Sequence, residues 1–354
     1  MKIGILTFHW GTNYGGVLQS FALQSFLQKK GFDVKIVNFA PLTFRDSIYR
    51  CFRTKSPKAL YSNLKNFIKE KNIEKFRKSN LSLTERFSSI KEMDDLSECF
   101  DTLITGSDQV WNPYGIQNYD LVYFLPFNKG ECRKISYAPS FGCVDYPKAV
   151  LDEIIPLIKD FNAISVREKS GLAILGDVGI TDVQLMPDPT LLLEKSDYLD
   201  LIKTTKKRKS NYAFFYTLQP NQTLISKICK NVNKKIKTIS TLNLESSIMG
   251  IESWISTIYH ADFVVTNSFH GVIFSLLLNK NFIVIPIEGS LTGMNDRIYT
   301  LLDLFDLQER LVDVFDEKIM YEKINSPIDW KEIEKVHHKI RLEASSFLLD
   351  NISK

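Results

Sequence analysis

The stretch WISTIYHADFVVTNSFHGVIFSLLLNKNFIVIPI, Trp254 to Ile287, decides the fold of this chain. Its pattern predicts an amphipathic helix, a buried strand, a polar turn, an apolar helix and a second buried strand. A run of polar residues lies in the turn Thr266 to Gly271, between the first strand and the apolar helix. In open α/β sheets, ligands bind at the carboxyl ends of strands, and the next helix start offers unpaired N–H groups to an anion. His270 lies at such a helix start, although a histidine there is also typical of a cap or a satisfied core residue.

A strand, helix and strand unit also opens the chain. KIGILTF (Lys2 to Phe8) and DVKIVNF (Asp33 to Phe39) read as buried strands, and apolar residues at helical spacing lie between them. The intervening turn HWGTNYGG holds Asn13, Tyr14, Gly15 and Gly16. Asparagine can cap the helix, and the glycines either allow a ligand to approach the backbone or only make the turn. The spacing is neither GxGxxG nor a Walker A loop, so nicotinamide and ATP cofactors are not supported.

Two more polar turns follow predicted strands. Ser107 and Asp108 come after the apolar run Asp101 to Thr105, and Arg167 comes after the short strand in NAISVREKSG. A carboxylate there can accept a proton or cap a helix. An arginine there can bind a carboxylate or phosphate through two parallel hydrogen bonds, or form an ion pair with Glu168 or another acid.

Four separate strand ends therefore carry Asn13, Asp108, Arg167 and His270. This combination predicts an α/β protein with two Rossmann-like, doubly wound domains that face each other across a cleft.

Six sequence blocks resemble the polysaccharide pyruvyl transferase family. They are NYGGVLQSFALQ, GSDQVWNP, ISYAPSFG, SVREKSG, PDPTLLL and TNSFHGVIFS, in the order that the family shows, from residue 2 to about residue 311. The resemblance implies a GT-B-like fold and transfer of a pyruvyl group from phosphoenolpyruvate to a sugar of a cell-surface polysaccharide, such as a capsule or exopolysaccharide, or its lipid-linked precursor. The product is usually a ketal.

Such a reaction needs cationic and N–H groups for a small dianion, and a general acid and base for the two proton transfers. His270 is the candidate acid or phosphate-stabilising group, and Asp108 is the candidate acceptor-side base. The remaining candidates are Arg167, Asn267, Ser268, Gly271 and Arg297 for the donor, and Asn13, Tyr14, Gly15, Gly16 and Ser107 for the acceptor or a phosphate loop.

One position departs from the family pattern. Some members resemble RLHG at the histidine block, whereas this chain has Ser268 two residues before His270. Another residue must then supply part of the positive charge that binds the anion, and Arg297 is the nearest candidate along the chain. The alternative for Arg297 is a surface ion pair with Asp296 or Glu288.

Length and composition agree with two domains. The chain has 354 residues, of which 44% are hydrophobic. We expect an N-terminal domain over residues 1–195 with a basic helical insertion at about 45–95, a C-terminal domain over 196–328, and a helix in 329–354 that returns to the first domain.

Cysteine and histidine usage predicts no metal site and no disulfide framework, because the five cysteines are scattered and lack a CxxC pair. We expect no cofactor, with phosphoenolpyruvate as a substrate. Met1 leads directly into an apolar strand without a signal-peptide pattern, and no apolar run is long enough to span a membrane. These features predict a cytoplasmic protein.

The segment from Arg45 to Lys91 is strongly basic, with thirteen Lys and Arg against four acids. It suggests two short amphipathic helices joined near Pro57. A basic amphipathic helix either contacts an anionic membrane surface or a lipid-linked acceptor, or is a solvated helix whose apolar side packs on the core. No nucleic-acid motif accompanies the segment.

Two other function classes fit the same pattern. A nucleotide-sugar-dependent GT-B glycosyltransferase would hold a nucleotide diphosphate at the helix start after His270. A non-catalytic binding or scaffold protein would release no phosphate from any donor. Stabilisation by phosphoenolpyruvate and not by nucleotide sugars would separate pyruvyl transfer from the first of these.

Overall fold

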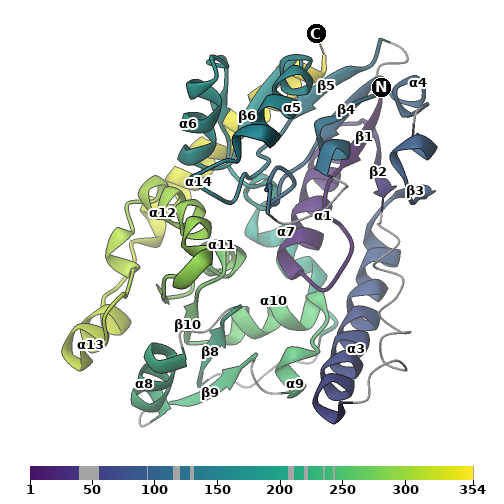
Figure 1. The fold of residues 1–354 in the computed structure, drawn as a ribbon. Helices are drawn as coiled ribbons and strands as arrows, with labels where there is room; N and C mark the ends of the chain where they lie inside the picture. Colours follow the sequence, from purple (N-terminus) through teal and green to yellow (C-terminus); the bar gives the residue numbers. More distant parts are fainter. Residues whose placement is uncertain are drawn as a thin grey trace. The chain divides into compact units, whose positions relative to one another are not determined.

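The computed structural model describes residues 1–39, 56–93, 95–114, 120–127, 131–205, 211–218, 222–233, 236–241 and 244–353 (Figure 1). The chain divides into two compact units. The N-terminal unit contains Met1–Glu70, Glu74–Leu193 and Lys339–Lys354, and the C-terminal unit contains Lys71–Ile73 and Glu194–His338. Each unit is built around its own parallel sheet.

The sheet of the N-terminal unit has seven strands in the order β3-β2-β1-β4-β5-β6-β7, and all neighbours run parallel. The strands are β1 (Lys2–Leu6), β2 (Asp33–Phe39), β3 (Leu83–Phe87), β4 (Thr102–Thr105), β5 (Arg133–Ser136), β6 (Ala163–Val166) and β7 (Gln184–Leu185). The chain builds outward from β1 in both directions, so the order reverses between β1 and β4. That reversal is the topological switch point, where doubly wound sheets bind ligands.

Helices complete the N-terminal unit. They are α1 (Tyr14–Lys29), α3 (Pro57–Asn80), α4 (Leu96–Cys99), α5 (Lys148–Lys159), α6 (Lys169–Asp177), the end of α14 (Trp330–Ile352), and the short 3-10 helices η2 (Ile90–Met93), η3 (Asp120–Phe124) and η4 (Pro189–Leu192). Ile154 and Ile158 of α5 and Leu175 of α6 share one apolar core with Leu103 of β4. Helix α14 joins this unit through Asn351, whose carbonyl accepts a hydrogen bond from Arg133 Nε at 3.0 Å.

The C-terminal unit has four parallel strands in the order β11-β10-β8-β9. Its elements are α7 (Lys195–Leu201), β8 (Tyr212–Tyr216), α8 (Gln222–Asn233), β9 (Lys237–Ser240), α9 (Leu244–Ser247), α10 (Ile251–His260), β10 (Phe263–Thr266), α11 (Phe269–Leu277), β11 (Phe282–Val284), η5 (Gly289–Asn295), α12 (Asp296–Leu304), η6 (Gln308–Arg310), α13 (Glu317–Asn325) and the start of α14. Its switch point lies between β8 and β10.

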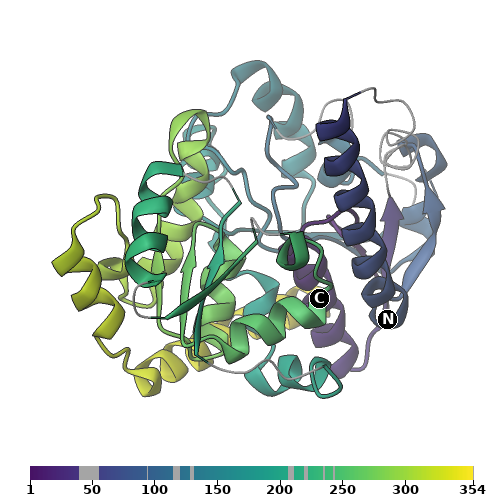
Figure 2. The same ribbon diagram turned by 90° about the horizontal axis from the view of Figure 1, so that it is seen from below.

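Helices cover both faces of this second sheet, as the burial of strand β8 shows. Side chains alternate along a strand, and all five residues of YAFFY are buried. Phe215 lies in a core with residues of α8, such as Ile228, whereas Tyr216 contacts Trp254 of α10 at 5.2 Å between ring centroids. Figure 2 shows these strands between helices seen from below. The predicted α/β class with two doubly wound parallel sheets is confirmed.

The described part of the basic segment differs from its prediction in the length of the helix that begins at Pro57 and in the strand β3 that follows it, and the first of the two predicted helices lies outside the described residues. Helix α3 is one helix of 24 residues that begins at Pro57, a residue tolerated in the first helical turn, where its missing N–H is not needed. Strand β3 then pairs in parallel with β2, so α3 is the crossover helix between two sheet strands. Residues 45–55 of the segment lie outside the described residues.

No helix in the described part of the chain is long and apolar enough to cross a membrane.

Candidate functional site

In each unit, candidate residues lie at the switch point of the sheet. In the N-terminal unit, Asn13 follows β1 and Asp108 follows β4, and these strands are neighbours. In the C-terminal unit, Asn267 and His270 follow β10, which neighbours β8. The candidate residues that the sequence placed at strand ends therefore lie at the switch point of each sheet, where such sheets bind ligands.

Asp108 faces the first turn of α1. Asn13 caps this helix, with its Oδ1 accepting from the Gly15 N–H at 3.1 Å. The Asn13 amide nitrogen also donates to Asp108 Oδ2 at 3.4 Å, and Asp108 Oδ1 accepts from the Gln109 N–H at 2.9 Å. A β-carbon at Gly16 would lie only 2.8 Å from Asp108 Oδ2. A side chain at position 16 would therefore have to displace this carboxylate.

The backbone of Asp108 is strained. Its φ of +73° is in the left-handed region, which non-glycine residues rarely adopt, and the side chain is 3% exposed. The Asp108 carbonyl accepts from the Ser140 N–H at 2.8 Å, which fixes this turn to the end of β5. Ala138 in the same region also has a positive φ, of +51°. Strained backbone gathers at functional sites, where the surrounding structure maintains it.

A lysine that the sequence analysis did not select lies beside this turn. The Lys69 ammonium of α3 is 4.2 Å from the centroid of the Tyr14 ring, and Tyr14 is buried at the first position of α1. Burial lowers the pKa of Lys69 to about 8, and the neighbouring Lys65 charge adds to the effect. Because only tertiary structure brings α3 to α1, no sequence spacing pointed to Lys69.

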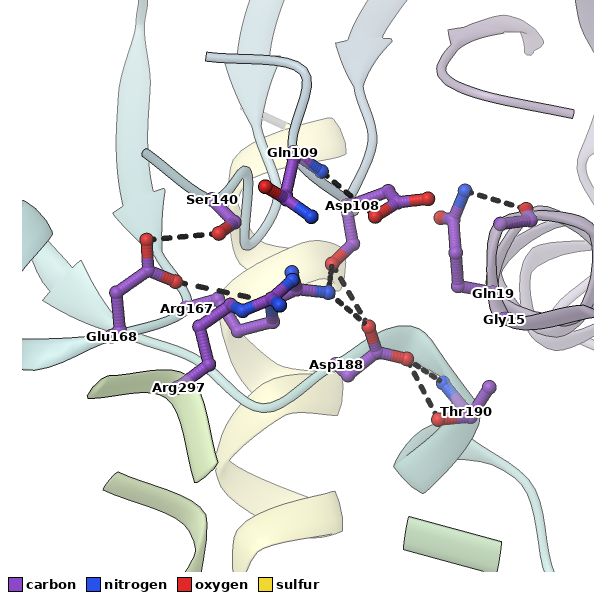
Figure 3. Close-up of polar contacts among 12 residues, drawn as sticks. Gly15, Gln19, Asp108, Gln109, Ser140, Arg167, Glu168, Asp188, Thr190 and Arg297 are labelled. Carbon is purple, nitrogen blue, oxygen red and sulfur yellow. Dashed lines mark hydrogen bonds and ion pairs between the residues drawn. The ribbon is translucent and has the colours of Figure 1, made fainter. Parts of the chain in front are cut away.

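Arg167 is buried in an ion pair with Asp188. Its Nη1 donates to Asp188 Oδ2 at 2.8 Å and to Ser107 Oγ at 3.2 Å, and the Ser107 hydroxyl donates to the same carboxylate oxygen at 3.0 Å. The other Asp188 oxygen accepts from Thr190 N–H at 3.0 Å and Thr190 Oγ1 at 2.7 Å. Figure 3 shows Asp188 between Arg167 and Thr190. The ion pair that the sequence left open for Arg167 is thus present, with Asp188 as the main acid.

Glu168 adds a second buried acid at this edge. Its Oε1 accepts from Ser140 Oγ at 3.0 Å, Phe141 N–H at 2.7 Å and Gly142 N–H at 3.2 Å, while Oε2 lies 3.8 Å from Arg167 Nε. Asp108, Glu168 and Asp188 thus outnumber the two cations named here, Arg167 and Lys69. Such an edge suits a neutral, hydroxyl-bearing ligand better than a doubly charged anion.

Tyr137 completes the buried polar residues around Asp188. Burial, together with the nearby Asp188 charge, raises the pKa of the Tyr137 hydroxyl well above its ordinary value. The hydroxyl therefore stays protonated at physiological pH. Tyr137, Asp188 and Thr190 were not selected from the sequence as site residues.

The turn after β10 is ordered by its own polar groups. Asn267 Oδ1 accepts from Leu218 N–H at 2.7 Å, which ties the end of β10 to the end of β8. Ser268 caps α11, and its Oγ accepts from the Gly271 N–H at 3.4 Å. Because a β-carbon at Gly271 would overlap Thr266 Oγ1, only glycine fits this position without a shift.

His270 and Arg297 both lie beside the start of α11. His270 is in the first turn of α11 and is 6% exposed. Arg297 is in the first turn of α12, is also 6% exposed, and places its guanidinium 5.7 Å from the centroid of the Phe269 ring. Arg297 is thus buried next to the residue preceding His270 rather than on the surface. A helix start, a histidine and an arginine together favour an anion.

The structure therefore groups the candidates by unit. The N-terminal unit holds Asn13, Tyr14, Gly15, Gly16, Ser107, Asp108 and Arg167, and the C-terminal unit holds Asn267, Ser268, His270, Gly271 and Arg297. The role of each in ligand binding stays a prediction.

The contact between Gly16 and Asp108 gives a first testable prediction. Gly16→Ala is expected to lower the free energy of unfolding by about 1 kcal/mol, because the new methyl group displaces the Asp108 carboxylate. In an Asp108→Gly background the same change should be neutral or stabilising by up to ~1 kcal/mol. Denaturant unfolding of the four proteins measures both values.

The matched control is Gly176→Ala in α6, where a β-carbon meets nothing within 4 Å. It should be neutral or stabilising in both backgrounds. An equal cost of Gly16→Ala with and without the Asp108 side chain would contradict the contact.

Comparison with known proteins gives a family and a fold. The chain matches the polysaccharide pyruvyl transferase family over residues 13–289. No curated protein matches it.

Solved structures resemble the chain over nearly its full length. The UDP-GlcNAc 2-epimerase from Neisseria meningitidis bound to UDP-GlcNAc has a TM-score of 0.53 and 10% identity, with 99% of both chains covered. UGT89C1 from Arabidopsis thaliana, complexed with UDP-L-rhamnose, has a TM-score of 0.52 and 10% identity, with 99% of this chain and 98% of that chain covered. The UDP-N-acetylglucosamine 2-epimerase from Rickettsia bellii has a TM-score of 0.51 and 10% identity, with 100% of this chain and 97% of that chain covered. These likenesses show a GT-B fold, as predicted.

Proposed function

Because this chain belongs to the polysaccharide pyruvyl transferase family, we propose that it transfers the pyruvyl group of phosphoenolpyruvate to a pair of sugar hydroxyls, forming a ketal. The acceptor is a cell-surface polysaccharide or its lipid-linked precursor. The observation that carries the proposal is the contrast between the two switch points. The N-terminal switch point presents the buried carboxylate of Asp108 beside Asn13, and the C-terminal switch point presents a helix start with His270 and Arg297.

The C-terminal unit supplies the donor-binding groups in this proposal. Phosphoenolpyruvate carries a carboxylate and a phosphate on a small carbon frame, so it needs several cationic and N–H groups in a small volume. His270, Arg297 and the N–H groups at the start of α11 are of this kind, and Asn267 and Ser268 shape the turn. Arg297 then replaces the arginine that some family members carry at the position of Ser268.

The N-terminal unit supplies the acceptor-side groups. Asp108 is a carboxylate held at a strand end by strained backbone, with Asn13 and the first turn of α1 beside it. A carboxylate in this position can take the proton of a sugar hydroxyl. Arg167 was expected to bind the donor directly. Its Nη1 already donates to Asp188 and Ser107. We therefore propose that the main role of Arg167 is to hold Ser107, and with it the turn that carries Asp108, in place.

The reaction requires two new bonds to one carbon. His270, as the acid, protonates the methylene carbon of the donor, and Asp108 takes the proton of the first sugar hydroxyl as its oxygen bonds to C2. The bond from C2 to the phosphate oxygen then breaks, and inorganic phosphate leaves. The oxygen of the second hydroxyl then bonds to C2 and closes the ketal, and the departing phosphate accepts its proton. C2 becomes the ketal carbon and C3 its methyl group, and proton exchange with solvent restores His270 and Asp108.

The test of this function is the donor-dependent release of phosphate. With phosphoenolpyruvate and candidate lipid-linked oligosaccharides, the protein is expected to release phosphate only when the acceptor is present. Thermal unfolding gives a parallel readout, because a ligand at 100 times its Kd stabilises the folded state by about 2.7 kcal/mol. Phosphoenolpyruvate should raise the Tm, and UDP-GlcNAc should not.

The opposite pattern would support the alternative function. Stabilisation by nucleotide sugars, with no response to phosphoenolpyruvate, would identify a GT-B glycosyltransferase. If no combination of donor and acceptor led to release of phosphate, the protein would instead be a non-catalytic binding protein.

A further inference from the structure

Helix α3 carries an excess of positive charge that the proposed reaction does not use. Its 24 residues include Lys58, Lys65, Lys69, Lys71, Lys75, Arg77 and Lys78, against only Glu70 and Glu74. Because it is also the crossover between β2 and β3, the fold holds it in place independently of any ligand.

One side of α3 packs onto the N-terminal unit through Phe76 and Arg77. Phe76 is fully buried and contacts Phe21 of α1 edge-on, at 5.4 Å between ring centroids. Arg77 is 5% exposed and donates from Nη1 to the Gly11 carbonyl at 2.9 Å. Its other nitrogens bind Glu70 and, at 2.8 Å, Glu74. Glu70 is mostly buried against Arg77, whereas the Glu74 side chain is 42% exposed and also lies 3.9 Å from Lys78.

The outer side of α3 presents apolar residues and then lysines along one stripe. Leu60, Tyr61 and Leu64 are 46%, 54% and 49% exposed. Lys71, Lys75 and Lys78 are also exposed. At 3.6 residues per turn, positions 60, 64, 71, 75 and 78 fall on one face of a helix. Of these lysines, Lys78 lies 3.9 Å from Glu74.

From this arrangement we propose that the outer face of α3 is a docking surface for an anionic membrane. Leu60, Tyr61 and Leu64 enter the boundary between headgroups and acyl chains, while Lys71, Lys75 and Lys78 lie over anionic headgroups. Charge complementarity favours this occupant. The lysines follow the apolar residues on the same stripe, Glu70 is paired with the buried Arg77, and the three lysines outnumber the partly exposed Glu74.

This inference deepens the proposed function, since it would bring the enzyme to a lipid-linked acceptor. Binding to lipid, however, does not depend on the reaction. The two can therefore fail separately in experiment.

The test is co-sedimentation of the full-length protein with vesicles. The anionic vesicles contain phosphatidylcholine with about 30% phosphatidylglycerol, and the neutral vesicles contain phosphatidylcholine alone. We expect the protein to bind the anionic vesicles and to bind the neutral ones little. Lys71→Gln, Lys75→Gln and Lys78→Gln together should weaken binding about 100-fold, at about 5-fold for each charge. Leu60→Ser with Leu64→Ser should also weaken it, because both side chains are already exposed and their replacement spares the core.

The matched control replaces three exposed lysines of α14, Lys331→Gln, Lys335→Gln and Lys339→Gln, which makes the same change in net charge. This variant should bind vesicles like the natural protein. All variants should release phosphate normally with a water-soluble acceptor. Equal binding to neutral and anionic vesicles, or equal losses in the α3 and α14 variants, would overturn the proposal. Binding to duplex DNA or RNA without vesicle binding would overturn it in favour of a nucleic-acid surface.

Discussion

Replacing His270 by alanine is expected to lower the turnover of phosphoenolpyruvate by about 10²–10⁴-fold, the range that a general acid contributes. His270 is in the first turn of α11, where the helix start favours the negative charge of the donor. The variant loses both the proton donor and part of the anion site. Steady-state phosphate release at saturating acceptor measures the effect.

A second histidine provides the control for this prediction. His338 lies on α14 and is exposed, so His338→Ala should leave turnover unchanged. Comparing donor affinity by thermal shift separates binding from chemistry. Full transfer by His270→Ala with unchanged affinity for phosphoenolpyruvate would remove His270 from the mechanism.

Asp108→Asn is expected to lower kcat by about 10²–10⁴-fold while leaving the dissociation constant of phosphoenolpyruvate nearly unchanged. The amide keeps the shape of the side chain but cannot take a proton from the acceptor. Asparagine also tolerates the left-handed backbone found at this position, where φ is +73°. Folding should therefore be retained.

The matched substitution is Asp145→Asn, at an exposed acid of the same unit, which should change neither quantity. If Asp108→Asn instead weakened donor binding as strongly as turnover, or lowered the Tm together with both, Asp108 would be a structural residue. The split between kcat and donor affinity is what a merely structural role would not produce.

Much of the fold could be predicted from the sequence, because buried parallel strands are nearly continuous apolar runs. DVKIVNF corresponds to β2 residue for residue, and the runs in the Trp254 to Ile287 stretch correspond to α10, β10, α11 and β11. Strand β3 (LTERF) was missed, since it is polar and only partly buried at the sheet edge. Two short helices joined near Pro57 were predicted; helix α3 does begin at Pro57 but is longer than expected, and the first predicted helix lies outside the described residues.

The positions of Asp108 and His270 shortly after β4 and β10 could be predicted, because both strands are apolar runs, whereas their roles stay predictions. Asp188 was missed because β7 before it has only two residues, both exposed, and so gives no apolar signal. The pairing of Asp188 with Arg167 across 21 residues depends on tertiary structure. The same holds for Lys69 over Tyr14 and for Arg297 beside Phe269.

The most direct test of pyruvyl transfer is NMR of the acceptor after incubation with phosphoenolpyruvate and the natural protein. We predict a new methyl signal and a new ketal carbon on the sugar, with one phosphate released for each group transferred. A vinyl methylene signal would instead indicate a single enol ether bond and contradict ketal formation. An unmodified acceptor, with phosphoenolpyruvate intact across the sugars and lipid-linked oligosaccharides tried, would contradict the proposed reaction itself.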